Sequence, residues 1–329
     1  MTYRDLIVDA SFLARRAWEA APDDDKRREM LMQAVCSKLV HWLTDDRFAR
    51  IVFAWDGAVG RRHDSDRPWC PRRAIWEDYK ARRKPPPSGY YDDLDELRGR
   101  LGAFGIVQAW SEEGEADDVI AGLVGLMAGP HCVWSVDKDL LQLVAAGVDV
   151  LRPDTSRRPR DVDPDDWKRP EDKLIGIETI AELTGHTPRG WRDFLALAGD
   201  NTDGIPGLKK VGKARANSIL AACPDVVSLV LAGRDDQARL QVMANDASMA
   251  QWVELAIEQR KELQVSVELV ELRPRVPVAF DERDAVGPAE ADEIAAWLQM
   301  AGLEEFAAWV IERVPAWRDA GFDDAEPTF

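Results

Sequence analysis

Short apolar runs that end in aspartate recur along this chain, and they constrain its fold more than any other feature. Leu6–Val8 leads into Asp9 and Ile51–Trp55 leads into Asp56, with a helical pattern of apolar residues between them. Strand, helix, strand is the unit from which parallel sheets are built, and ligands bind beyond the carboxyl ends of such strands. The sequence therefore predicts an α/β fold with a central, mainly parallel, twisted sheet flanked by helices, and both aspartates at one edge.

A second acidic feature is the stretch 114–120, where Glu115, Asp117 and Asp118 precede an apolar helical pattern. In isolation this would be a solvated turn, because carboxylates complement the dipole at a helix start. Repetition favours another interpretation, since further aspartates stand where predicted strands or helices give way to turns: Asp9, Asp56, Asp137, Asp139, Asp200 and Asp203. Such a cluster would repel itself or raise its pKa values, and divalent metal relieves that repulsion.

Asp137 and Asp139 follow the predicted strand 131–136. Residues i and i+2 of an extended chain point the same way, so both carboxylates can face one ion while Lys138 points elsewhere. The alternative is a helix N-cap followed by an early helical carboxylate. Other elements are expected as follows: a helix of about twenty residues opening at 23–25, a helix at about 91–104, a loop at 153–170, a strand at 263–270, and helices at about 288–299 and 303–313.

The segment 60–89 changes character to Arg, Trp, Tyr and Pro, and it is either a solvated basic loop or a mobile basic arch over the acidic site. Tyr79 and Trp76, interleaved with cations, favour the arch, because aromatic platforms beside phosphate contacts hold single strands. A second basic cluster, Lys209, Lys210 and Lys213, lies in a glycine-rich turn with Gly207 and Gly212. Backbone N–H groups exposed at a helix N-terminus can hold a phosphate.

The overall charge of −17 argues against a nucleic-acid partner at face value, but the two basic segments are compatible with a protein that grips a phosphate backbone. The chain has no apolar run long enough to span a membrane and no secretory pattern, so a cytoplasmic location is expected. Its four cysteines are far apart and suggest neither disulfides nor a zinc site.

Several motifs in order resemble the 5′-nuclease family, which includes the N-terminal nuclease domain of family A DNA polymerases, bacteriophage 5′ to 3′ exonucleases and flap endonucleases. The resemblance runs from about residue 6 to 220. The matching motifs are Ile7-Val8-Asp9, Phe53-Ala54-Trp55-Asp56, Tyr79-Lys80, Glu115-Ala116-Asp117-Asp118, Asp137-Lys138-Asp139, and Gly199-Asp200 through Asp203 to Pro206-Gly207. Many relatives have Asn where this chain has Gly204, a departure expected to affect the turn more than the metal.

The resemblance implies a PIN-like nuclease core with a helical arch and a helix-hairpin-helix subdomain. It also implies two Mg²⁺ ions, with Mn²⁺ as a substitute, and K⁺ at the glycine turn. The first metal set matches Asp9, Asp56, Glu115 and Asp117, with Asp118 bridging, and the second matches Asp137, Asp139, Asp200 and Asp203. Lys80 and Arg72 would reach the scissile phosphate, with Tyr79 as a stacking partner. The DNA-binding residues would be Arg73, Arg82, Arg83, Lys84, Gly207, Lys209, Lys210, Gly212 and Lys213.

The expected domains are a nuclease core at 1–185 with the arch at 60–89, a helical DNA-binding subdomain at 186–262 with its hairpin at 197–220, and a C-terminal strand and helices at 263–329. The expected activity is structure-selective 5′ to 3′ exonuclease or flap endonuclease action in replication or repair, by a free-standing, phage-type monomer. Its partners would be DNA with a 5′ flap, free 5′ end or junction, RNA/DNA primers and replication proteins. Two alternatives stay open: an inactive structure-specific DNA-binding protein, and a phosphohydrolase for small molecules.

Overall fold

A computed structural model describes residues 2–21, 26–43, 45, 47–57, 70–84, 86, 89–103, 106–153, 173–281 and 299. Within them, one seven-stranded sheet has the order β6-β5-β4-β1-β2-β3-β7. Its five central strands run parallel: β1 (Tyr3–Asp9), β2 (Phe48–Trp55), β3 (Val107–Trp110), β4 (His131–Trp134) and β5 (Val148–Arg152). The edge strands β6 (Lys173–Ile175) and β7 (Ala279–Asp281) are antiparallel to their neighbours. The mainly parallel α/β sheet predicted from the sequence is confirmed.

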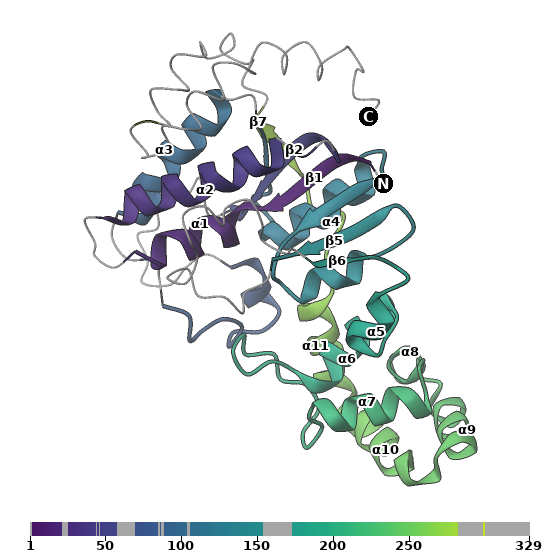
Figure 1. Ribbon diagram of the computed structural model, residues 1–329. Helices are drawn as coiled ribbons and strands as arrows, with labels where there is room; N and C mark the ends of the chain where they lie inside the picture. Colours follow the sequence, from purple (N-terminus) through teal and green to yellow (C-terminus); the bar gives the residue numbers. More distant parts are fainter. Residues whose placement is uncertain are drawn as a thin grey trace.

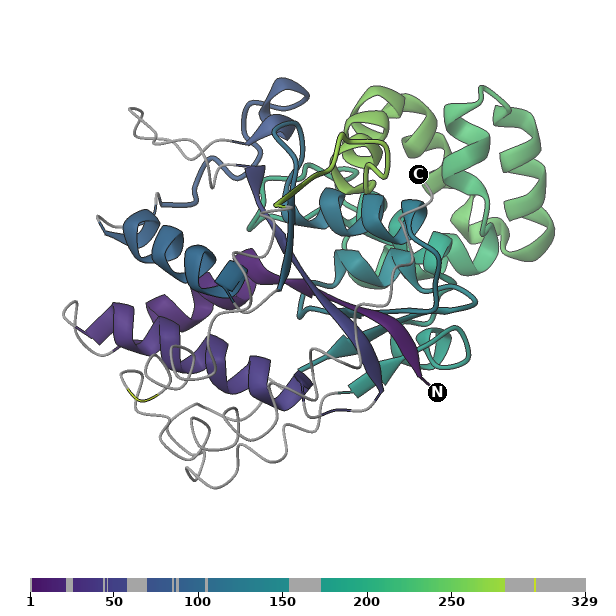
Figure 2. The same cartoon turned by 90° about the horizontal axis from the view of Figure 1, so that it is seen from above.

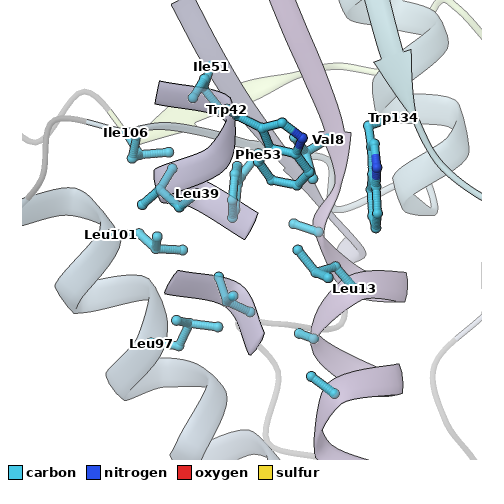
Figure 3. Close-up of a cluster of buried hydrophobic side chains, with 14 of the residues drawn as sticks. Val8, Leu13, Leu39, Trp42, Ile51, Phe53, Leu97, Leu101, Ile106 and Trp134 are labelled. Carbon is cyan, nitrogen blue, oxygen red and sulfur yellow. The ribbon is translucent and has the colours of Figure 1, made fainter. Parts of the chain in front are cut away.

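Helices cover both faces of this sheet (Figures 1 and 2). On one face lie α1 (Ala10–Glu19), α2 (Arg27–Leu43) and α3 (Tyr90–Ala103), and α4 (Ala116–Leu126) packs on the other face with the 3-10 helix η4 (Asp139–Leu143). Figure 3 shows the core beneath the first group, where Trp42 packs against Phe53 and Leu97 lies in the same cluster. Burying these large side chains, each worth about 1.5–3 kcal/mol, fixes the helices against the sheet and so fixes the strand ends.

A helical region adjoins this core (Figure 1). It comprises α5 (Ile180–Thr184), α6 (Pro188–Ala198), α7 (Lys213–Ala222), α8 (Val226–Leu231), α9 (Asp235–Asn245), the 3-10 helix η7 (Ala247–Met249), α10 (Ala250–Glu258) and α11 (Arg260–Val270). Its apolar centre is separate from the two clusters on the sheet, and it takes in Tyr79 from the basic segment. The arch is therefore anchored in the helical region through this buried ring.

The strand predicted at 263–270 is wrong, because these residues form most of α11. Leu263, Val265, Val267 and Leu269 alternate with polar residues, which indicated a strand. The buried side chains are instead Leu263, Ser266, Val267, Leu269 and Val270, a set that contains the three- and four-residue spacing of a helix face. Packing against the other helices of this region, which the sequence does not reveal, favoured the helical period over the strand period.

Helix α1, which begins immediately after Asp9, was not predicted from the sequence. The Asp9 carboxylate caps it by accepting a hydrogen bond of 3.1 Å from the Phe12 N–H. The helix of about twenty residues is confirmed as α2, although its predicted opening at 23–25 lies outside the described residues. Also outside them are nearly all of the loop at 153–170 and, apart from residue 299, the helices at 288–299 and 303–313.

Candidate active site

The first carboxylate of the site, Asp9, ends β1 and is nearly buried. Its Oδ2 accepts a hydrogen bond of 2.8 Å from the Ser135 hydroxyl at the end of β4. The Ser135 oxygen in turn accepts the Asp137 N–H at 3.0 Å. Because β1 and β4 are parallel neighbours, this hydroxyl holds the first and second predicted metal sets at one edge of the sheet.

Asp56 follows β2 at the same edge and contacts the acidic turn before α4. Its Oδ1 accepts the Ala116 N–H at 2.8 Å, and its own N–H donates to the Ser11 hydroxyl at 2.8 Å. Backbone bonds of this kind orient a carboxylate and offset part of the cost of enclosing it. The structure thus brings Asp56 beside Glu115, as the sequence predicted.

Two basic side chains of the arch lie on the acidic turn. Arg72, in the 3-10 helix η3 (Pro71–Ala74), is 1% exposed, and its Nη1 lies 2.5 Å from Glu115 Oε2 and 3.3 Å from Asp117 Oδ1. Lys80 Nζ lies 2.6 Å from Glu115 Oε1. The Tyr79 hydroxyl donates to Glu115 Oε2 at 3.3 Å. The three residues predicted to act on the phosphate therefore converge on one carboxylate.

These cations set the ionisation of Glu115. Enclosure in the protein opposes its ionisation, but Lys80 and Arg72 outweigh that effect and lower the pKa of Glu115 to about 2. Glu115 is thus an anion at neutral pH.

The carboxylates of the second predicted set are held by separate contacts, two of them with cations. The Asp139 N–H donates to Asp137 Oδ1 at 2.8 Å. Asp203 pairs with Arg83 at 2.5 Å, and Asp200 pairs with Lys138. Lys138 does not point away from this set as expected, because its ammonium lies on Asp200, and this contact was missed because the turn after α6 is distant in sequence. The backbone at Lys138 is helical and Asp139 begins η4, so the extended arrangement expected for Asp137 and Asp139 is wrong and the helix-start alternative is closer to the structure.

Enclosure and mutual repulsion disfavour the charged form of two carboxylates, Asp9 and Asp139. Burial, with Asp137 and Asp56 nearby, raises the pKa of Asp9 to about 7. Burial and the neighbouring Asp137 raise the pKa of Asp139 well above its ordinary value, and its buried Oδ1 has no hydrogen-bond partner. In the part of the chain that the structure describes, no three acidic, His or Cys side chains are spaced to enclose a metal ion.

The donor set nevertheless fits a divalent cation. All the side chains concerned offer carboxylate oxygens, which are the ligands that Mg²⁺ takes while keeping several waters. The unpartnered Asp139 oxygen and the raised pKa values mark a place where positive charge is missing. Asp9, Asp56, Asp137 and Asp139 are the residues that would hold such an ion, with Glu115 and Asp117 beside them.

The residues predicted to bind DNA fall into two groups. Arg73 braces the arch by donating to the Tyr79 carbonyl at 3.1 Å, whereas Arg82, Arg83 and Lys84 are exposed. The second group lies between α6 and α7: Gly207, Lys209, Lys210, Gly212 and Lys213, with the three lysines exposed. Gly207 is required there, because a Cβ would lie 2.7 Å from the Gly199 nitrogen.

Gly204 explains the departure from the family pattern noted in the sequence. It has φ +71°, and a Cβ would lie 2.3 Å from the Asp78 carbonyl oxygen at the base of the arch. The adjacent Asp203 carbonyl accepts the Lys80 N–H at 2.8 Å. The glycine therefore lets the arch backbone dock on the turn after α6, next to the acidic site.

We expect Gly204→Ala to lower the free energy of unfolding by about 1–3 kcal/mol, because alanine is strained at this φ and its Cβ meets backbone. Gly99→Ala is the matched control, since Gly99 lies inside α3 with open space around it. It should raise stability by about 0.5–1 kcal/mol. Urea unfolding measures both, and equal stability of the two variants would contradict the close approach.

Within the described residues, no helix is both long and apolar enough to cross a membrane.

Comparison with known proteins gives a consistent result. The sequence profile of the family described as 5′-3′ exonuclease, N-terminal resolvase-like domain, matches residues 4–169. The chain is 28% identical to the flap endonuclease Xni of Shewanella denitrificans over 220 residues, which is 65% of this chain and 76% of that protein. It is 31% identical to DNA polymerase I of Mycobacterium bovis over 236 residues, which is 68% of this chain and 24% of the polymerase.

Solved structures share the fold at low identity. The bacteriophage T5 flap endonuclease, in a complex with DNA and metal ions, aligns with 94% of this chain and 98% of its own, at a TM-score of 0.55 and 16% identity. The family profile covers half of the chain. The chain therefore belongs to the 5′-nuclease family, the nucleases that include 5′ to 3′ exonucleases and flap endonucleases.

Proposed function

We propose that this protein is a divalent-metal-dependent 5′ to 3′ exonuclease and flap endonuclease that hydrolyses phosphodiester bonds near 5′ ends of DNA. The observation that carries the proposal is the edge of the sheet where Asp9 and Asp56 follow parallel strands and Glu115 lies against the cations of a basic arch. Two Mg²⁺ ions are its proposed cofactors, because the donor set is all oxygen. A role in replication or repair follows from its substrate.

When bound, the divalent ions supply Lewis-acid chemistry for hydrolysis of the phosphodiester. The carboxylates would hold the ions, and Asp9 and Asp139 would do so as anions. Lys80 is the cation placed to stabilise charge that develops on the scissile phosphate, since its side chain is 17% exposed and reaches the site. Arg72 is 1% exposed and surrounded by carboxylates, so we assign it to holding Glu115 and Asp117.

The exposed lysines of the turn between α6 and α7 would grip the duplex backbone, with K⁺ as a proposed ion at that turn. Contacts to phosphate are blind to base sequence. We expect one 5′ flap structure built in two unrelated sequences to be cut at the same position and at rates within about threefold, since phosphate contacts carry no sequence information. Gel analysis of 5′-labelled products measures this, and a strong preference for one sequence would contradict backbone recognition.

A phosphohydrolase for small molecules is the competing activity. The arch and the turn after α6 count against it, because a small substrate needs neither. Bis(4-nitrophenyl) phosphate discriminates the two, since it has the scissile bond without a strand to hold. We expect cleavage of the flap with negligible turnover of this ester, and the reverse would favour the competing activity.

The acidic site also predicts how stability depends on pH. Asp9 has a folded pKa of about 7, above its ordinary value. A raised carboxyl pKa contributes stability that is complete below the ordinary value of about 3.9 and is lost as pH rises through about 7. In EDTA we therefore expect the melting temperature to fall between pH 6 and pH 8, with Mg²⁺ reversing the fall. Greater stability at pH 8 than at pH 6 without metal would contradict the raised pKa.

A further inference from the structure

The carboxylate of Asp118 is fully buried, and donors occupy both of its oxygens. Oδ1 accepts from Arg72 Nη2 at 2.7 Å and from the Arg273 N–H at 2.9 Å. Oδ2 accepts from Arg273 Nη2 at 2.7 Å, from Arg273 Nε at 3.2 Å and from the Glu115 N–H at 3.3 Å. With five donors around it, Asp118 has no free lone pair directed at an ion, unlike Asp139.

The two guanidinium groups on Asp118 come from segments that are far apart in the sequence. Arg72 belongs to the base of the arch, and Arg273 lies in the segment that follows α11. Three carboxylates, Glu115, Asp117 and Asp118, face three cations, Arg72, Arg273 and Lys80. The group is balanced in charge only while Arg273 is present, and an unbalanced buried charge is costly.

The segment carrying Arg273 is fixed to the helical region. The Ser266 hydroxyl of α11 accepts the Gly207 N–H at 3.0 Å, which holds the glycine turn. At the end of α11, Arg192 of α6 pairs with Glu271 at 2.8 Å, and Gln142 donates to the Val270 carbonyl at 2.9 Å. Figure 1 shows α11 between the sheet and the other helices. Through α11, Arg273 thus connects the glycine turn between α6 and α7 to the acidic site.

We infer that Arg273 is a positioning residue of this nuclease, which acts through Asp118 to hold Arg72, and with it Glu115 and Asp117, in the geometry that the reaction needs. Asp118 is then an anchor of the arch and not a metal ligand, which changes the role that family resemblance implies for it. The inference rests on the proposed nuclease function for its kinetic consequence. Its structural part stands on the contacts alone.

The kinetic test compares Arg273→Ala, Arg273→Lys and the control Arg275→Ala on a 5′ flap with Mg²⁺. Arg275 lies two residues further on and is exposed. We expect Arg273→Ala to lower kcat by about 10–100-fold with little change in KM, as small misplacements of reacting groups do. Arg273→Lys should recover part of the loss, because an ammonium replaces the charge but not the paired hydrogen bonds. Arg275→Ala should behave as the wild type.

Two further measurements do not depend on cleavage. Mn²⁺ binding, followed by electron paramagnetic resonance, should be unchanged in Asp118→Asn and at least about tenfold weaker in Asp9→Asn, since only the latter loses a ligand. In thermal unfolding, the losses of stability caused by Asp118→Asn and by Arg273→Ala should not add. The double variant should be at least as stable as the less stable of the two single variants. Loss of Mn²⁺ affinity in Asp118→Asn, or additive destabilisation, would overturn the inference.

If the wild type cuts no 5′ end, the proposed function fails, while Mn²⁺ binding and the unfolding cycle still test the anchor. If the wild type cuts but Arg273→Ala has normal kcat and the unfolding effects add, the anchor fails and the nuclease stands.

Discussion

Lys80→Ala is expected to lower kcat for flap cleavage by about 10²–10³-fold, the usual effect of removing one group that stabilises charge in a transition state. Lys80 reaches Glu115 at the edge where the carboxylates meet, and its backbone is held by the Asp203 carbonyl at 2.8 Å. It therefore stands at the site before substrate arrives. Single-turnover cleavage measures the effect, and flap affinity in Ca²⁺ should change little.

Lys84→Ala is the matched control for Lys80→Ala, because Lys84 is an exposed lysine of the same segment. We expect it to weaken flap binding by no more than a few-fold, as one phosphate contact among many, and to leave kcat unchanged. A loss of kcat in both variants would mean that the arch contributes general positive charge. A normal kcat in Lys80→Ala would mean that Lys80 does not stabilise the transition state.

Asp9→Asn is expected to lower activity by about 10³-fold or more, because a bound divalent ion supplies several kcal/mol to such reactions. Asparagine keeps the Oδ1 that caps α1 and can donate its amide to the Ser135 hydroxyl. The substitution also removes a buried carboxyl group whose pKa lies near 7. In EDTA at pH 8 we therefore expect the variant to be at least as stable as the wild type.

The effect of losing the Asp9 carboxylate can be distinguished from simple misfolding of the variant. The stabilisation by Mg²⁺ and the fall in melting temperature from pH 6 to pH 8 should both diminish in Asp9→Asn. Asp95→Asn, at an exposed position of α3, should keep activity, Mg²⁺ response and pH dependence. Lower stability of Asp9→Asn in EDTA at pH 8 would contradict the burial of an unfavourable charge there.

Much of the site could be predicted because it lies where strands end. Asp9 and Asp56 follow apolar runs, and parallel strands deliver their ends to one edge without knowledge of the rest of the fold. The contacts of the arch could not be predicted in the same way. Arg72 and Arg73 are adjacent and chemically alike, yet one is buried among carboxylates and the other braces backbone carbonyls.

The features that were wrongly predicted or missed depend on tertiary contacts. The alternation at 263–270 has the period of a strand, and only packing against α6 and its neighbours makes it a helix. Arg273 has no local pattern at all, because its partner Asp118 lies 155 positions earlier in the chain. A charge that is matched only in space leaves no periodic signal in sequence.

Cleavage of a 5′-labelled DNA flap by the purified protein tests the central claim most directly, with Mg²⁺, with EDTA, and with Asp137 and Asp139 both changed to alanine. The account predicts short labelled products that require metal and that disappear in the double variant. Tight binding of the flap without cleavage, in Mg²⁺ and in Mn²⁺ alike, would contradict it and identify a structural DNA-binding protein.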